Sequence, residues 1–307
     1  MAVRTRRTAA QRREYLWCFL LLVPLLVTFG GFTLWPIVAS WWYSFFDWDG
    51  VGTPTDWVGL ANFVEVASNA AFWRAFWHSF LFSLVAIGVE LPLALVFAIL
   101  LNNVRLRGRN LYRLALFVPV VTTTAVVGIV FVALLDPVRG SVNDALLTLG
   151  LIDAPINFLG STSSALPSLM VIDLWKGFGV SLVYWLAALQ TVPKELIEAA
   201  QLDGARRSSV VRHIMVPVMA PIAIVIMLLL FQRSLGTFDL VQAMTAGGPI
   251  YSTDVVPTFI YRFAFDPEMQ APRYGFACAA GVVFGMLTLV LTLMQAPALR
   301  YQRRVSV

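Results

Sequence analysis

Residues 76–101 read FWHSFLFSLVAIGVELPLALVFAILL, one of several long apolar runs in this chain. The hydrocarbon core of a bilayer is about 30 Å thick and takes about 20 helical residues to cross. The run contains one carboxylate, Glu90, and one proline, Pro92. A proline breaks most soluble helices, but a spanning helix tolerates it when its neighbours satisfy the freed carbonyl. We therefore expect residues 76–101 to form a membrane-spanning helix.

Similar runs lie on either side of this one, and together they predict six spans. The spans cover roughly residues 16–40, 76–101, 111–135, 166–190, 216–235 and 276–296. The chain is 59% hydrophobic and 13% charged, whereas soluble domains have about 45–50% apolar and about 25% charged residues. We expect an all-α membrane protein with one transmembrane domain over residues 16–297 and basic tails over residues 1–15 and 298–307.

The first apolar run has a second interpretation, a cleaved signal peptide, because a cluster of arginines precedes it. The run is longer than the usual apolar region of about 7–15 residues, and no small-x-small cleavage site ends it. Aromatic residues follow it instead, namely Trp41, Trp42, Tyr43, Phe45 and Phe46. Aromatic side chains gather at membrane interfaces, so we interpret the run as a retained span followed by an interfacial belt.

Charge alternates between the segments that join the predicted spans. The two tails and the loops after the second and fourth spans are basic; they hold Arg4, Arg6, Arg7, Arg12, Arg13, Arg105, Arg107, Arg109, Arg113, Lys194, Arg206, Arg207, Arg212, Arg300, Arg303 and Arg304. The other three loops carry most of the acids, including Glu268. This alternation follows the positive-inside rule and predicts a cell-membrane protein with both termini in the cytoplasm. Because topology explains the net charge of +5, we expect no nucleic-acid partner.

The sequence offers few groups for catalysis or metal binding. Cys18 and Cys278 lie inside apolar runs with no redox or metal spacing, and we interpret them as small packing residues. His78 and His213 are predicted on opposite sides of the membrane, so they make no metal site. The chain also lacks the phosphate-cradling G-x-x-x-x-G-K-[ST] loop of an ATPase.

The loop after the fourth predicted span, residues 191–217, reads TVPKELIEAAQLDGARRSSVVRHIMVP. It predicts a helix, a tight turn and a second helix. Thr191 is a possible cap, and Pro193 suits a first helical turn. Gly204 supplies the turn, and Pro217 opens the fifth span. Such a helix could enter a groove on a partner protein, or it could be an ordinary loop helix lying against the membrane.

One motif in this loop resembles a known family. Glu198, Ala199 and Ala200, then Asp203 and Gly204, then Ile214 and Pro217 are similar to the EAA motif. That motif, E-A-A-x-x-x-G followed after nine residues by I-x-x-P, marks permease subunits of binding-protein-dependent ATP-binding-cassette importers. The resemblance implies that the loop is a cytoplasmic coupling helix between helices four and five, the type I importer permease architecture, and that it docks into the ATPase subunit.

A second stretch narrows the resemblance to the carbohydrate-uptake branch, the maltose and glycerol-3-phosphate permease type. Phe238-Asp239, Thr245, Gly247-Gly248-Pro249 and Thr253 match its F-D-x-x-x-x-x-T-x-G-G-P-x-x-x-T pattern. The segments Tyr274-Gly275-Phe276-Ala277 and Gly59-Leu60-Ala61-Asn62-Phe63 fit the same branch. Taken alone, Gly247-Gly248-Pro249 could be an ordinary outer turn.

The resemblance also implies partners. In this family a second permease chain completes the path, and an ATPase dimer beneath the pair forms a heterotetrameric core with it. An extracytoplasmic solute-binding protein delivers the sugar-like substrate. ATP and Mg²⁺ would be bound by the ATPase subunits, so we expect no cofactor in this chain and no catalytic residue.

Ionisable groups inside a membrane are functional candidates because their burial is costly. Glu90, Asp173, Lys176 and Arg233 qualify, and we expect Glu90, beside Pro92, to be structural. By their position relative to the family's substrate site, the candidates for the substrate path are Asp173, Trp175, Lys176, Gly177, Arg233, Ser234 and Thr237, with Tyr184 as a second aromatic that could stack on a sugar. The charged candidates could instead pair with each other, as Asp173 and Lys176 can at i,i+3, or with the partner chain.

Two other classes compete with the importer interpretation. A secondary transporter would show internal repeats and coupling-ion carboxylates at the midplane, and we find neither clearly. A membrane enzyme would need a nucleophile with its base, or a metal cluster, and no such spacing stands out. The EAA loop therefore favours an importer permease, whose solute the sequence does not identify.

Overall fold

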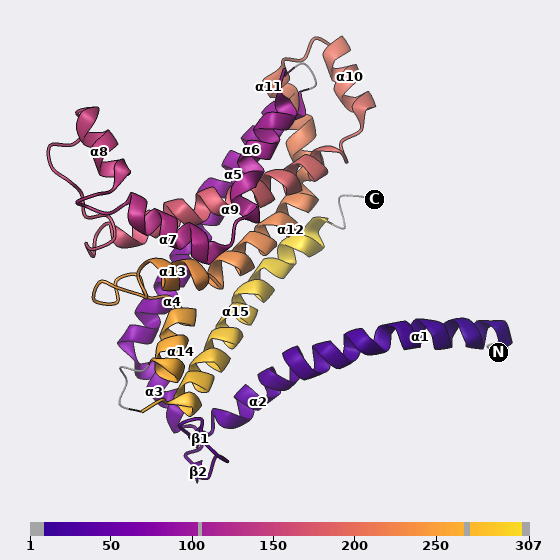
Figure 1. Cartoon of the computed structure of the whole chain (residues 1–307). Helices are drawn as coiled ribbons and strands as arrows, with labels where there is room; N and C mark the ends of the chain where they lie inside the picture. Colours follow the sequence, from indigo (N-terminus) through magenta and orange to yellow (C-terminus); the bar gives the residue numbers. More distant parts are fainter. Residues whose placement is uncertain (1–8, 104–105, 267–270, 303–307) are drawn as a thin grey trace. The chain divides into compact units, whose positions relative to one another are not determined.

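The computed structural model describes residues 9–103, 106–266 and 271–302 (Figure 1). Its elements are α1 (Ala9–Phe29), η1 (Gly30–Leu34), α2 (Trp35–Tyr43), β1 (Phe46–Asp47), β2 (Asp56–Trp57), α3 (Ala61–Ser68), α4 (Ala70–Val85), η2 (Ala86–Glu90), α5 (Leu91–Asn102), α6 (Arg109–Val121), α7 (Thr124–Leu134), α8 (Ser141–Thr148), α9 (Ala165–Leu189), α10 (Lys194–Leu202), α11 (Arg207–Val210), η3 (Val211–Met215), α12 (Val216–Leu235), α13 (Asp239–Met244), α14 (Val256–Phe265) and α15 (Tyr274–Gln302). The segments η1, η2 and η3 are π-helical turns.

Helix reaches into both predicted tails, since α1 begins at Ala9 and α15 continues to Gln302. The remaining tail residues, 1–8 and 303–307, lie outside the described residues. So do Arg105 and Glu268, which contributed to the charge alternation of the loops.

Within the described residues, helices with the length and composition of a membrane span cover Leu16–Tyr43, Ala70–Asn102, Ala165–Leu189, Arg207–Met244 and Tyr274–Gln295. Three of them contain the whole of a predicted span, whereas Ala165–Leu189 and Tyr274–Gln295 each begin before the predicted span and end one residue short of it. A sixth span exists only if α6 and α7 count as one, because these two helices meet at a bend of 98°. The third predicted span, residues 111–135, is therefore a bent pair of helices and not one continuous helix.

The bend between α6 and α7 has an identifiable backbone cause. Thr122 and Thr123 both adopt extended conformations, with ψ near 137° and 140°. Pro119, one turn earlier, has no N–H to donate to the helix. Both threonines are also β-branched, and such side chains lower helix propensity.

Prolines account for the three π turns. The π turns η1, η2 and η3 each precede a helix whose second residue is a proline: Pro36 in α2, Pro92 in α5 and Pro217 in α12. In each case the N–H just before the proline donates to a carbonyl five residues back, as Leu91 does to Ala86. This wider turn accommodates the missing donor without ending the span. Pro217 thus lies inside a span that starts at Arg207, and the prediction that it opens the fifth span is corrected.

The chain divides into two compact units, Met1–Ala67 with Phe263–Val283, and Ser68–Arg262 with Phe284–Val307. In the first unit the β1–β2 hairpin pairs Phe46 with Trp57. The buried Asn62 donates from Nδ2 to the carbonyls of Ser44 and Phe46, at 3.0 and 2.9 Å. Arg273 forms a bidentate pair with Glu65, with both N–O distances 2.7 Å. Its hydrogen bond holds the pKa of the Glu65 carboxyl below its usual value.

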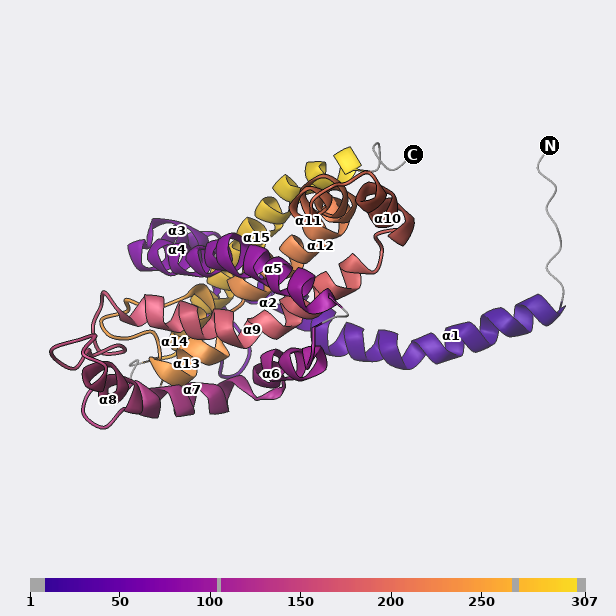
Figure 2. The same ribbon diagram turned by 90° about the horizontal axis from the view of Figure 1, so that it is seen from above.

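The second unit is a helical bundle in which α5, α6, α9 and α12 run side by side (Figures 1 and 2). Small residues let these helices approach closely, including Ala94 and Ala98 of α5. Trp185 of α9 donates from its indole N–H to the carbonyl of Leu91 at 2.9 Å. The helices α10 and α11 lie at one end of the bundle, and α8 and α13 lie at the other.

The contact of α6 with Gly179 of α9 supplies a test of this packing. A Cβ on Gly179 would come within 2.6 Å of the Leu116 carbonyl oxygen and 2.8 Å of Val120 Cγ2. Gly179→Ala should therefore force the two helices apart and cost about 1–3 kcal/mol of stability. Thermal unfolding of the detergent-solubilised chain should show a lower midpoint. Gly88→Ala is the matched control, because a Cβ there meets nothing within 4 Å; equal midpoints for the two variants would contradict the packing described.

Candidate functional site

A buried charge cluster links three elements of the second unit. Glu90, the last residue of η2, is fully buried. Arg233 of α12 binds both of its carboxylate oxygens, at 2.7 Å from Nη2 to Oε2 and 3.3 Å from Nη1 to Oε1. Ser181 of α9 donates a hydrogen bond of 2.5 Å to Oε1. Two donors thus compensate a carboxylate that would otherwise be costly to bury.

The α9 side of the cluster follows helical spacing. Asp173, Gly177 and Ser181 are four residues apart, which places them on one face of the helix. A Cβ on Gly177 would collide with the Arg233 guanidinium, so the absence of a side chain at Gly177 creates the space that Arg233 occupies. Asp173 Oδ2 lies 3.6 Å from Arg233 Nη2. Arg233 therefore lies between two carboxylates.

The fold brings together only some of the residues that the sequence predicted for the substrate path. Asp173, Gly177 and Arg233 meet, whereas the possible i,i+3 pair of Asp173 with Lys176 is absent among the ion pairs of the described residues. Glu90, which was expected to be structural, is the most buried member of the cluster. The sequence signal for it was its position as the one acid in an apolar run.

The remaining path candidates lie close to the cluster in sequence, on α9 and at the end of α12. Ser234 is buried, and its hydroxyl has no partner within the described residues. Thr237 follows at the end of α12, where its N–H bonds the Ser234 carbonyl at 3.4 Å. Trp175 is 46% exposed and packs edge-on against Phe131 of α7 at 5.4 Å. Tyr184 is likewise exposed, so both aromatics predicted to stack on a sugar have accessible faces.

The predicted helix–turn–helix of residues 191–217 is present at one end of the bundle. After α10, the Ala205 N–H bonds the Ala200 carbonyl at 2.9 Å, and the Gly204 N–H bonds the Gln201 carbonyl at 3.1 Å. These two bonds are a Schellman motif, which requires a left-handed residue after the helix. Gly204 has φ +78° and meets nothing within 4 Å of a Cβ position. The turn therefore depends on the backbone of Gly204 and not on its packing.

The start of this loop differs from the prediction. Thr191 donates its hydroxyl to the Ala188 carbonyl at 2.8 Å, so it closes the end of α9 and does not cap α10. Pro193 precedes the first turn of α10 and is not within it. Its ψ of 129° directs the chain away from α9 before the new helix begins.

The helix α10 has two faces. Ile197 and Ala200 pack against the apolar core formed by α5, α9 and α12, as do Ala205 and Ile214 beyond the turn. The opposite face is open; it presents Glu198, Ala199, Leu202 and Asp203, and Leu202 is 89% exposed. The EAA residues therefore divide between the two faces, with Ala200 turned inward and Glu198 and Ala199 outward.

At the other end of the bundle, the Gly247-Gly248-Pro249 segment is a closed loop rather than a simple turn. Thr253 donates its hydroxyl to the Gly248 carbonyl at 2.7 Å and lies 2.8 Å from the Thr245 hydroxyl. Asp254, the next residue, is buried and pairs with Arg262 at 2.7 Å. Burial raises the pKa of the Asp254 carboxyl, and the Thr258 hydrogen bond and the Arg262 charge oppose that rise.

The part of the chain that the structure describes contains no candidate metal site. No group of three or more His, Cys, Asp or Glu side chains gathers there. The groups that gather in this region are hydrogen-bond donors and acceptors, buried charges and exposed aromatics.

Three comparisons bear on this arrangement. Residues 90–300 match the family model described as "Binding-protein-dependent transport system inner membrane component". The sn-glycerol-3-phosphate transport system permease protein UgpA of Yersinia pestis is 30% identical over 278 residues, which cover 90% of this chain and 92% of UgpA. The lactose transport system permease protein LacF of Rhizobium radiobacter is 27% identical over 301 residues, which cover 97% of this chain and 99% of LacF.

A solved structure is also similar. It is a chain of the bacterial alginate ABC transporter in complex with alginate pentasaccharide-bound periplasmic protein. The TM-score is 0.80 at 25% sequence identity, and the match covers 96% of each chain.

The ion pair of Glu90 with Arg233 predicts how the stability of a single variant and of a double variant should differ. Arg233→Met should leave the buried Glu90 carboxylate without its cation and cost about 3–5 kcal/mol. The double variant Glu90→Gln with Arg233→Met should recover much of this loss, because it leaves no buried charge and keeps a group that Ser181 can bind. Thermal unfolding of the purified chain measures both.

Arg139→Met is the control for these two variants, and it should leave the unfolding midpoint unchanged. Arg139 is exposed and forms no ion pair within the described residues. If the double variant were as unstable as the single one, the pairing of Arg233 with Glu90 would not carry the stability assigned to it.

Proposed function

This chain belongs to the family of binding-protein-dependent transport system inner membrane components, and from that membership we propose that it is a permease subunit of an ATP-driven importer for sugars or related solutes. The family inferred from the EAA motif is thereby confirmed, as is the all-α membrane fold. The names of the relatives support the solute class, because they transport glycerol 3-phosphate, lactose and the polysaccharide alginate.

We further propose that α10 couples this chain to the ATPase, and the supporting observation is the open face of that helix. Glu198 and Ala199 lie on a short helix whose inner face, Ile197 and Ala200, is packed on the bundle. A helix fixed on one side and open on the other suits a groove on a partner. We assign Glu198, Ala199, Ala200, Asp203, Gly204, Ile214 and Pro217 to this coupling segment, with Glu198 making a charged contact to the ATPase.

The orientation of the chain follows from this assignment. If α10 meets the ATPase, its end of the bundle faces the cytoplasm, in agreement with the basic loops and with two cytoplasmic termini. The opposite end, with α8 and the loop after α13, then faces the solute-binding protein. The full importer would add a second permease chain and an ATPase dimer that binds ATP and Mg²⁺.

For the solute path we propose the face of the bundle around the charge cluster. Trp175 offers an exposed aromatic surface for a sugar ring. The partly exposed Arg233 and Lys176, and the unpartnered hydroxyl of Ser234, offer donors. Asp173, Gly177 and Thr237 complete the set, and Glu90 holds Arg233 in place from the buried side.

Co-purification of the tagged chain from its native host in mild detergent tests the assembly. We expect a second permease chain, an ATPase and a solute-binding protein. Glu198→Lys should lose the ATPase because it reverses the charge on the open face of α10. Asp153→Lys should keep it, because Asp153 is exposed in the segment that follows α8, and α8 lies at the other end of the bundle. Recovery of the chain without an ATPase, under conditions that preserve other such complexes, would contradict the importer and favour a secondary transporter.

The turn after α10 gives a graded prediction. The φ of +78° at Gly204 is tolerated by asparagine but not by β-branched residues. ATP-driven uptake by the assembled importer should therefore fall slightly for Gly204→Asn and strongly for Gly204→Val. Gly150, just after α8 at the other end of the bundle, has a similar φ of +65°, so Gly150→Val should lower stability but leave the ATPase associated. Equal uptake for the two Gly204 variants would refute the role of the turn.

A further inference from the structure

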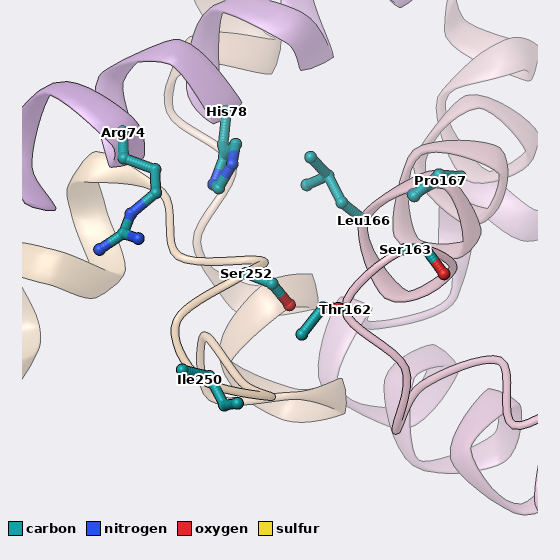
Figure 3. Close-up of a pocket in the computed structure, with 8 residues that line it drawn as sticks. All are labelled: Arg74, His78, Thr162, Ser163, Leu166, Pro167, Ile250 and Ser252. Carbon is teal, nitrogen blue, oxygen red and sulfur yellow. The ribbon is translucent and has the colours of Figure 1, made fainter.

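A cavity lies at the end of the bundle opposite α10, and none of the charge-cluster residues line it (Figure 3). Its volume is about 510 Å³, within the range of about 300–1,000 Å³ typical of small-molecule sites. Three parts of the chain line it: Arg74 and His78 from α4, Thr162 and Leu166 from the turn before α9 and its first residues, and Ser252 from the loop after α13. None of these residues was singled out as part of the solute path.

The polar groups of this cavity have unused hydrogen-bonding capacity. The His78 Nδ1 lies 2.8 Å from the Asp254 carbonyl oxygen. A carbonyl can only accept, so Nδ1 carries the hydrogen and the Nε2 of a neutral ring is an acceptor. The Ser252 hydroxyl is buried and has no partner within the described residues. An acceptor and a free hydroxyl on facing elements match the mixed donors and acceptors of a sugar ring.

The charge of the cavity is positive. Arg74 forms no ion pair within the described residues, and no acidic side chain lines the space. The carboxylate of Asp254, the residue whose carbonyl contacts His78, is engaged by Arg262 at 2.7 Å and by Thr258 at 2.6 Å. Arg74 therefore has its planar, two-pronged set of donors available, the geometry that fits a carboxylate.

The walls of the cavity are held in place before any ligand arrives. The loop that carries Ser252 is closed by the hydrogen bonds of Thr253 to Gly248 and Thr245. In the close-up, His78 and Leu166 project toward the same space from opposite sides, with Ser252 below them. Leu166, with the neighbouring Pro167 and Ile250, supplies apolar surface for the C–H face of a ring.

We propose that this cavity is an entry subsite for an acidic sugar, with Arg74 binding the carboxylate of a uronate unit and His78 and Ser252 binding its hydroxyls. The inference rests on the proposed importer function and narrows its solute class. A phosphate bears about −1.5 to −2 charge and three acceptor oxygens. Arg74 is the one lysine or arginine in the lining, so the site matches the single charge of a carboxylate better than the larger charge of a phosphate.

Ligand titration of the full chain in lipid nanodiscs, followed by ligand-observed NMR, tests this subsite. The probes are digalacturonate, the neutral digalactose and glycerol 3-phosphate. Digalacturonate should bind most tightly, and Arg74→Gln should weaken it about tenfold, the size of one charge-assisted hydrogen bond. Ser252→Ala should weaken digalacturonate and digalactose alike. Arg139→Gln, an exposed arginine outside the cavity, should change nothing.

Three results would overturn the proposal: equal binding of digalacturonate and digalactose, a preference for glycerol 3-phosphate, or digalacturonate binding that Arg74→Gln leaves intact. The importer function is judged separately, because it requires the ATPase to co-purify with the Arg74→Gln variant. A variant that keeps the ATPase but shows no uronate preference would remove the subsite and leave the importer in place.

Discussion

The pairing of Glu90 with Arg233 is the interaction on which the helical bundle depends. A carboxylate at this depth, with no exposure to solvent, is tolerated only when a cation and hydrogen-bond donors compensate it. The cation arrives from α12, and Ser181 of α9 supplies the further donor. Arg233 can reach Glu90 only because Gly177 leaves its path open. Three elements distant in sequence are thus fixed by one buried charge.

Backbone hydrogen bonding imposes the second constraint. In a bilayer every N–H and C=O must find a partner within the protein, yet prolines such as Pro36, Pro92 and Pro217 lie inside spans. The π turns before Pro36, Pro92 and Pro217 resolve the conflict by shifting one hydrogen bond to the carbonyl five residues back. Glu90 is the last residue of the turn before Pro92. The same local device therefore keeps the span continuous and sets the position of the buried carboxylate.

These features give the proposed importer a physical link between its two ends. The helix α9 carries Asp173, Gly177 and Ser181 and ends at Leu189, with only residues 190–193 before α10. The helix α12 carries Arg233 and continues from η3 and α11 on the other side of the Gly204 turn. A displacement of α10 by a docked ATPase would act on both helices that hold the charge cluster. Packed helices with discrete arrangements transmit such displacements as rigid bodies.

The sequence by itself determined the fold class, the approximate spans and the turn at Gly204, because each depends on local properties. Apolar length sets a span, and the left-handed conformation that Gly204 adopts is one that glycine tolerates without strain. The bend at Thr122 and the partner of Asp173 were decided by the tertiary structure. Helical spacing favoured Lys176, but the space beside Gly177 brings Arg233 within reach. The cavity of Arg74, His78 and Ser252 likewise emerged only on folding, since its walls come from segments more than 80 residues apart, a separation that no local pattern encodes.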